Sequence, residues 1–174
     1  NMLRVLELTK SLKEQRPSLL VVLGGPEVSE KRYAERLLRT HGGIDAVVRG
    51  EGEESLAELV RHFLRPGRKP LGPGFTLRTG QRTWHSTPDR GPVRDLSRLP
   101  SPYLDGGYDY SDDRRHSFNL QSSRGCANAC RYCHGGTTRL RYFPLARVLE
   151  EVKMVFSCPH FGGAMFSDND FFAN

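Results

Sequence analysis

The sequence predicts an α/β fold in two successive units: a doubly wound sheet over residues 1–67 and the start of a second unit over 116–174, joined by a connector at 68–115. Three observations predict it. Short apolar runs alternate with stretches that carry apolar residues at helical spacing, as in a parallel sheet with helical crossovers. Several of these runs end in or begin after glycines. A stretch rich in proline and glycine separates the two alternating regions.

The first unit is predicted to alternate helices with strands. The run 19–23 holds only leucine and valine, which favours a strand buried on both faces of a sheet. Pro17 ends the helix before this strand, and Ser29 is expected to cap the helix after it. In order, the predicted elements are a helix before Pro17, a strand at 19–23, a helix between Ser29 and Gly42, a strand at 44–48 and a helix at 55–64.

The connector and the second unit follow the same logic. A hairpin is expected around 79–81. Three tyrosines, Tyr103, Tyr108 and Tyr110, are expected to anchor the connector, with lining of a substrate entrance as the alternative. The second unit is predicted to contain a strand at 118–122, a helix that begins at Pro144, and a strand at 164–166 after Gly162-Gly163.

Two turns after predicted strands are candidate binding positions, one with Gly24 and Gly25 and the other with Gly50 and Glu51. Ligands of doubly wound sheets bind at the carboxyl ends of the strands. Glycines remove side chains where a ligand can lie flat on the backbone. The alternative is structural: the glycines make tight turns, and the acidic residue favours a helix N-terminus through its dipole.

Three of the four cysteines lie within eight residues, Cys126, Cys130 and Cys133, in the spacing C-x3-C-x2-C. Thiolates are soft ligands that suit iron–sulfur clusters, zinc or copper(I). Intervals of four and three residues return side chains to one side of a helical turn, so the sulfurs can converge. Structural zinc sites and electron-transfer clusters use four ligands as a rule, so three thiolates on a four-iron cluster leave one iron open. The alternatives are a zinc site completed by His134 or a distant residue, and simple burial, which is expected for Cys158.

The cysteine loop resembles the cluster loop of the radical SAM superfamily, C-x3-C-x-aromatic-C, with Tyr132 at the aromatic position. The resemblance implies a 4Fe–4S cluster held by the three cysteines. Its open iron would chelate S-adenosylmethionine (SAM), whose reductive cleavage yields a 5′-deoxyadenosyl radical. The resemblance also implies that Tyr132 helps to place the adenine, mostly through its backbone, and that Asp168 makes a polar contact near the cofactor. A turn or a helix cap is the alternative for Asp168.

The segments 23–29 and 44–53 are similar to the second half of the cobalamin-binding domain that precedes many radical SAM barrels. This resemblance implies that Gly24 and Gly25 lie against the nucleotide tail of cobalamin, with Gly50 and Glu51 near the same pocket. The expected fold is then the C-terminal half of a doubly wound, Rossmann- or flavodoxin-like cobalamin domain, followed by the first strands of a radical SAM β/α partial barrel. The half of the domain that faces the cobalt is not in this sequence, so the axial ligand of cobalt stays open.

The composition excludes some classes of function. The net charge of +6 comes from 26 basic and 20 acidic residues, and the arginines are scattered, which makes nucleic acid an unlikely partner. The longest aliphatic run, 19–23, is far shorter than a membrane span. Thiols and an oxygen-sensitive cluster both suit the reducing cytoplasm.

We therefore expect a fragment of a radical SAM enzyme, inactive by itself, whose parent is a cobalamin-dependent methyltransferase acting on an unactivated carbon or phosphorus centre. A cobalamin-linked radical cyclisation or rearrangement is the second enzyme hypothesis. A zinc-bound module that binds nucleic acid or protein is the alternative of another class. The expected partners are a small-molecule or peptide substrate and an electron donor such as flavodoxin or ferredoxin, without a membrane. No catalytic residue is assigned.

Overall fold

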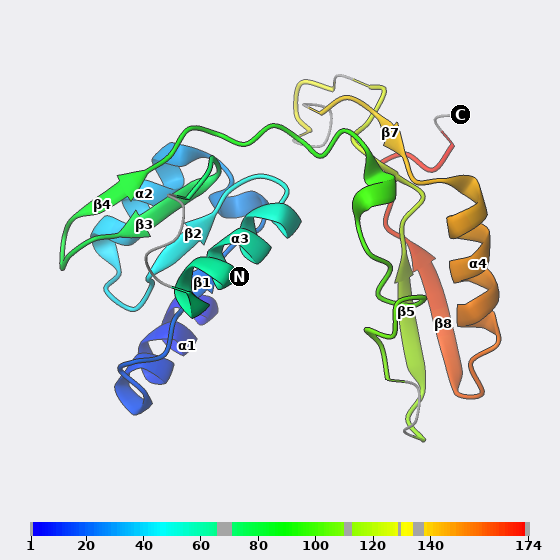
Figure 1. The fold of residues 1–174 in the computed structure, drawn as a ribbon, viewed down its shortest axis with the longest axis horizontal. Helices are drawn as coiled ribbons and strands as arrows, with labels where there is room; N and C mark the ends of the chain where they lie inside the picture. The colour runs from blue at the N-terminus through cyan, green and yellow to red at the C-terminus, as the bar shows by residue number, and fades with distance from the viewer. Residues whose placement is uncertain (1, 66–70, 110–112, 129, 134–137, 173–174) are drawn as a thin grey trace. The chain divides into compact units, whose positions relative to one another are not determined.

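The computed structural model describes residues 2–65, 71–109, 113–128, 130–133 and 138–172. The chain forms two compact units, Asn1–Pro92 and Val93–Asn174, each with its own sheet (Figure 1). None of the described helices is long and apolar enough to cross a membrane.

The first unit holds a four-stranded mixed sheet. Strands β1 and β2 are parallel, and β3 and β4 follow β2 antiparallel, in the spatial order β1-β2-β3-β4. In chain order the elements are α1 (Met2–Gln15), β1 (Val22–Leu23), the 3-10 helix η1 (Pro26–Val28), α2 (Lys31–Thr40), β2 (Ala46–Val48), α3 (Glu53–Leu64), β3 (Phe75–Arg78) and β4 (Trp84–Ser86). The predicted α/β class is confirmed. The hairpin expected in the connector is present, and it extends this sheet, so the first compact unit continues to Pro92.

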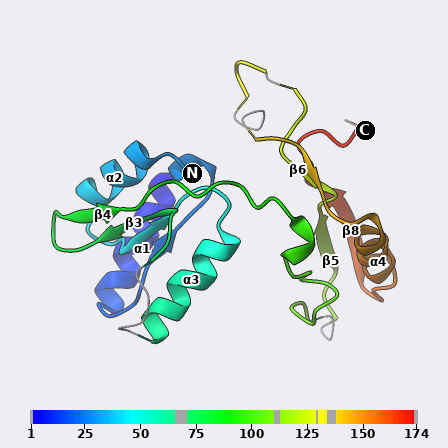
Figure 2. The ribbon, with the colours of Figure 1, turned by 45° about the horizontal axis from the view of Figure 1, so that its top comes forward.

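Helices cover both faces of this sheet. Successive side chains of a strand point to opposite faces. Val47 accordingly packs with Leu38 of α2, whereas Ala46 and Val48 pack with Leu59 of α3. Figure 2 shows α2 and α3 on opposite sides of the strands. The sheet is therefore doubly wound, as predicted.

The prediction that Ser29 caps α2 was wrong. The residue at the cap position is Glu30, whose side chain makes no capping hydrogen bond within the described part of the chain. The hydroxyl of Ser29 instead donates to the carbonyl oxygen of Gly25 at 2.9 Å. Pro26 begins the short η1 helix, so the chain turns once more before α2, and Ser29 stabilises that turn.

The second unit is built on two parallel strands joined by one helix. Its elements are η2 (Leu96–Arg98), β5 (His116–Leu120), β6 (Ser123–Arg124), β7 (Arg141–Tyr142), α4 (Leu145–Phe156) and β8 (Phe161–Phe166). Strand β5 pairs with β8 in parallel, and β6 pairs with β7 antiparallel. Alternate residues of β5 are buried, namely His116, Phe118 and Leu120, while Ser117 and Asn119 are exposed. One face of the sheet thus packs on α4 and the other is exposed.

Strand β8 begins earlier than predicted and includes Gly162 and Gly163. The register of β5 against β8 shifts between His116 and Ser117, so Gly162 has no paired residue. A Cβ atom on Gly162 would lie 2.8 Å from the carbonyl oxygen of His116. The glycine therefore permits a β-bulge inside the strand rather than ending the connection before it.

Two tyrosines of the connector, Tyr103 and Tyr108, anchor it to β5, as predicted, while Tyr110 lies outside the described residues. The hydroxyl of Tyr103 donates to the carbonyl of Asn119 at 2.6 Å and accepts from its amide at 3.1 Å. It thereby satisfies backbone groups on a strand edge, which are otherwise open to pairing with another chain. The hydroxyl of Tyr108 lies 3.0 Å from Nδ1 of His116.

Candidate functional site

The two glycine turns of the first unit lie at one edge of the sheet. Strands β1 and β2 are parallel neighbours, with Leu23 opposite Val47, so the residues that follow them leave the sheet on the same side. A Cβ on Gly24 would lie 3.5 Å from the carbonyl oxygen of Val48, the last residue of β2. The expectation that the turns at Gly24 and Gly50 meet at the carboxyl ends of the strands therefore agrees with the sheet register.

Gly25 and Gly50 need glycine because of their backbone conformation. Gly25 has φ 103° and ψ 173°, a region that only glycine adopts without strain. Among the described residues, no heavy atom lies within 4 Å of a Cβ built on Gly25. Gly50 has φ 73°, and its Cβ would lie 3.7 Å from the carbonyl oxygen of Arg90. The backbone at Gly25 therefore has open space before it that a flat ligand could use.

A buried arginine, which sequence reasoning missed, holds the end of β2 just before Gly50. The side chain of Arg49 is 1% exposed, and its guanidinium donates to the carboxylate of Asp89 and to the carbonyls of Thr87 (2.5 Å) and Pro88 (3.4 Å). A charged residue at the end of an apolar strand was the available signal, because a buried guanidinium needs several acceptors.

Arg90 fixes the same segment to α3. Its guanidinium contacts Glu54 at 3.4 Å and Glu58 at 2.5 Å, and its Nε donates to the carbonyl of Pro73 at 3.1 Å. Arg49 and Arg90 thus hold the segment that packs beside the Gly50 turn. Glu51, partly buried in that turn, keeps its role near a cofactor as a prediction.

The cysteine loop of the second unit begins at a glycine that tolerates no side chain. Gly125 has φ 86°, and a Cβ on it would lie 2.5 Å from the carbonyl oxygen of Thr138. The next residue, Cys126, donates its amide to that same carbonyl at 3.2 Å. Cys126 is partly exposed, whereas Cys130 and Cys133 are exposed, and all are free thiols. The start of the loop is therefore held tightly, and its later cysteines face solvent.

The described residues contain no group of three His, Cys, Asp or Glu side chains placed to hold a metal ion, so the three sulfurs are not gathered around one point. The donor set nevertheless fits an iron–sulfur cluster, because three thiols lie on one short loop and two of them are exposed. The amide of Asn128, 3.4 Å from the sulfur of Cys126, is a donor of the kind that tunes thiolate ligands. His134, the alternative ligand for zinc, lies outside the described residues.

Asp168 follows β8 and contacts the end of β5. Its carboxylate accepts hydrogen bonds from the amide of Ser122 at 3.1 Å, from the hydroxyl of Ser122 at 2.7 Å and from that of Ser123 at 2.5 Å. Partial burial by itself would raise the pKa of Asp168, but the hydrogen bonds from Ser123 and Ser122 outweigh it and lower that pKa below its ordinary value. Its contact with a cofactor stays a prediction.

Two neighbours of Asp168, to which the sequence analysis assigned no individual role, also contact the loop. The side chain of Asn169 donates to the carbonyl of Gly125 at 3.4 Å, and Asp170 accepts from the side chain of Asn128 at 2.9 Å. Tyr132 is 93% exposed, and its place near the adenine is not tested by the structure.

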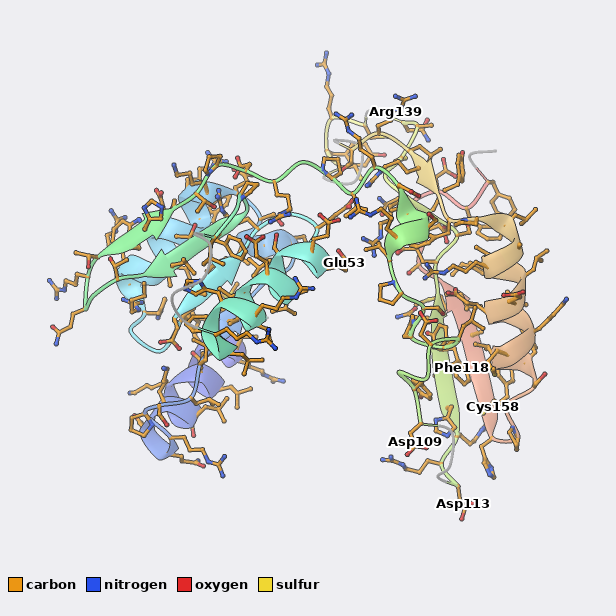
Figure 3. The ribbon with its side chains drawn as sticks, viewed as in Figure 1. Glu53, Asp109, Asp113, Phe118, Arg139 and Cys158 are labelled. Carbon is orange, nitrogen blue, oxygen red and sulfur yellow. The ribbon has the colours of Figure 1, made fainter. Side chains whose placement is uncertain are left out.

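Cys158 is not part of this group. Figure 3 shows Cys158 beside α4 near Phe118, while Arg139 lies at the opposite end of the unit, with the cysteine loop. Cys158 is 7% exposed and packs in the core with Phe118 and Val155. The prediction that it is a small buried residue is confirmed.

Comparison with known proteins gives a family match within the first unit and relatives that align with most of the chain. Residues 1–60 match the family described as the B12 binding domain. A 2-(S-pantetheinyl)-carbapenam-3-carboxylate methyltransferase of Streptantibioticus cattleyicolor is 32% identical over 168 residues, 88% of this chain and 24% of the relative. The cobalamin-dependent radical SAM methyltransferase TokK of Streptomyces tokunonensis is 30% identical over 164 residues, which cover 88% of this chain and 24% of the relative. An anaerobic magnesium-protoporphyrin IX monomethyl ester cyclase of a Synechocystis species is 27% identical over 142 residues, which cover 74% of this chain and 26% of the relative.

The fold is also shared with a solved structure. The cobalamin-dependent S-adenosylmethionine radical enzyme OxsB, with aqua-cobalamin and S-adenosylmethionine bound, matches 99% of this chain and 24% of its own with a TM-score of 0.69 at 19% identity. The chain spans about a quarter of the length of these relatives. Fold and motifs define a B12-type α/β unit followed by the first strand–helix–strand of a radical SAM unit. The chain belongs to the cobalamin-binding subgroup of the radical SAM superfamily.

Proposed function

We propose that the full-length protein containing this chain is a cobalamin-dependent radical SAM enzyme that transfers a methyl group to an unactivated carbon or phosphorus centre. One observation carries the proposal: two candidate binding places occur in one chain that is similar to two methyltransferases. The first is the C-x3-C-x2-C loop after β5, and the second is the pair of glycine turns at the carboxyl ends of β1 and β2. Each of these places is where its fold binds ligands.

The residues of this chain have distinct tasks in the proposal. Cys126, Cys130 and Cys133 hold a 4Fe–4S cluster, and the turns at Gly25 and Gly50 receive cobalamin. When bound, the cluster, SAM and cobalamin together supply the electron, the radical and the methyl group. The chain positions them: Gly125 admits the close approach of the backbone at Thr138, and Ser29 fixes the Gly25 turn.

The remaining roles rest on the same assignment. Tyr132 is proposed to contact the adenine of SAM, and Asp168 is proposed to act near the cofactor. A small molecule or peptide is the substrate, and flavodoxin or ferredoxin is the type of electron donor. Four free thiols suit a reducing compartment, which supports a cytoplasmic location.

Metal analysis tests the cluster. The full-length protein, reconstituted without oxygen, is expected to hold about four irons and four sulfides for this site and to be brown. Cys130→Ala should lose them, because the exposed thiol is a ligand. Cys158→Ala is the matched control, since that cysteine is buried in the core, and should retain them. One zinc in a colourless protein would instead support a zinc-bound binding module.

Gel filtration tests cobalamin binding. The full-length protein should retain cobalamin, and Gly25→Leu should lose it, because the side chain would fill the open space before that backbone. Gly106→Leu is the control for backbone strain: it also has positive φ (73°) and open space among described residues, but lies in the second unit. Equal retention of cobalamin by Gly25→Leu would contradict the assignment of this turn.

A second candidate is a radical cyclisation or rearrangement, favoured by the 27% identity to the cyclase. An assay with SAM that carries a labelled methyl group distinguishes methyl transfer from cyclisation or rearrangement. Label in the product supports methyl transfer. Formation of 5′-deoxyadenosine with unlabelled product supports the cyclisation or rearrangement.

A further inference from the structure

The segment 168–170, which follows β8, contacts the beginning of the cysteine loop through each of its three side chains. Asp168 accepts from Ser122 and Ser123, at the end of β5. Asn169 donates to the carbonyl of Gly125 at 3.4 Å, and Asp170 accepts from the side-chain amide of Asn128 at 2.9 Å. Successive residues of the segment therefore contact successive positions of the loop, from Ser122 and Ser123 through Gly125 to Asn128.

These contacts enclose one cysteine. Cys126 lies directly after Gly125 and two residues before Asn128, so the chain is held on both sides of it, at the backbone of Gly125 and at the side chain of Asn128. The backbone amide of Cys126 also donates to the carbonyl of Thr138 at 3.2 Å, a residue that follows the three cysteines in the sequence. In keeping with this, Cys126 is only partly exposed, while the two later cysteines are exposed.

We propose that the segment 168–170 positions Cys126 before the cluster binds, so that this first ligand is already in place when the rest of the loop closes on the cluster. Asn169 and Asp170 are positioning residues, which act through Gly125 and Asn128 rather than on the cluster itself. The gain is entropic, because a ligand that is ordered beforehand does not have to be ordered on binding. The cluster part of this inference rests on the proposed function.

The pair Asn128 and Asp170 allows a reciprocal exchange as the test. Asn128→Asp places two carboxylates against each other and removes the hydrogen bond. Asp170→Asn keeps an acceptor for Asn128 and should have little effect. The double variant, with Asp at 128 and Asn at 170, restores a donor–acceptor pair and leaves the net charge unchanged.

The first measurement is hydrogen exchange over residues 122–128 in the full-length protein without its cluster, so its result does not depend on metal. Asn128→Asp should speed exchange there by about five-fold or more, the factor expected for one hydrogen bond. The double variant should return toward the wild-type rate. Asp113→Asn, at an exposed carboxylate 3.7 Å from His160, is the control and should change nothing in this segment.

The second measurement is iron retained after a chelator is added to the reconstituted protein. Asn128→Asp should lose iron several-fold faster than wild type, and the double variant should recover most of the difference. Equal exchange rates in wild type and Asn128→Asp would overturn the proposal, as would a double variant no better than the single one. If exchange behaves as expected but the protein binds only zinc, the positioning of Cys126 is supported and the proposed function is overturned.

Discussion

The two units use their sheets differently. In the first, helices cover both faces, and the edge where β1 and β2 end presents the backbone of Gly25, with open space before it among the described residues, and that of Gly50, beside Arg90. In the second, one face of the β5–β8 sheet packs on α4, and the other carries exposed side chains such as Asn119 and Met165. The first unit therefore offers a surface shaped by glycines, and the second offers thiols and polar side chains.

Charge is also treated differently in the two units. The first unit buries the guanidinium of Arg49, whose terminal nitrogens donate to the carboxylate of Asp89 and to the carbonyls of Thr87 and Pro88. The second keeps the carboxylate of Asp168 partly exposed, with hydroxyl and amide donors around it. A buried charge is costly when its partners are lost, so the first unit depends more on a single residue than the second does.

The largest expected effect is therefore on Arg49. Arg49→Ala should lower the free energy of unfolding of the first unit by about 3 kcal/mol, because a fully buried side chain and its hydrogen bonds to Thr87 and Pro88 are lost. The measurement is urea unfolding followed by the fluorescence of Trp84, the single tryptophan, which packs in that unit. Arg82→Ala, at an exposed arginine, is the control. If Arg49→Ala lowered the free energy of unfolding by less than about 1 kcal/mol, the first unit would not depend on this buried charge as proposed.

The covered and exposed faces of the second sheet can be compared directly. Leu120→Ala should cost about 2–4 kcal/mol, because Leu120 is fully buried in the core against α4. Met165→Ala, with 62% of the residue exposed on β8, should change stability by less than about 0.5 kcal/mol. Native-state hydrogen exchange of peptides from α4 and β5 measures the stability change of each variant. Similar costs for the two variants would show that the second face is covered in the full-length protein.

A smaller and pH-dependent effect is expected at Asp168. The lowered pKa means that its ionised form stabilises the fold above the ordinary carboxyl value of 3.8, and this contribution is lost as the pH falls through the lower folded value. Asp168→Asn should destabilise the second unit by about 1 kcal/mol at pH 7. Stability measured by circular dichroism across pH 2–7 should show a smaller acid loss in the variant than in wild type. Parallel pH curves would contradict the role of the carboxylate.

Much of the fold could be predicted from the sequence, because periodicity is local. The helix expected before Pro17 is present and ends at Gln15. The strand expected at 19–23 is shorter and less buried than predicted: it covers only Val22–Leu23, both half-buried, and Leu20 is exposed. The glycine turns could be placed at one edge, since parallel strands end on the same side. Two details were missed for a physical reason: the cap at Ser29 and the bulge at Gly162 depend on a neighbouring turn and a neighbouring strand.

By itself the sequence determined the alternation of helices and strands, the glycine turns and the spacing of Cys126, Cys130 and Cys133, because each is a property of residues close together in the chain. Only the tertiary structure decided which side chains hold these sites. Arg49 meets Asp89 across 40 positions of sequence, and Asp168 meets Ser122 across 46. Such partners are chosen by the packing of distant segments, where a polar group must find a donor or acceptor once water is excluded.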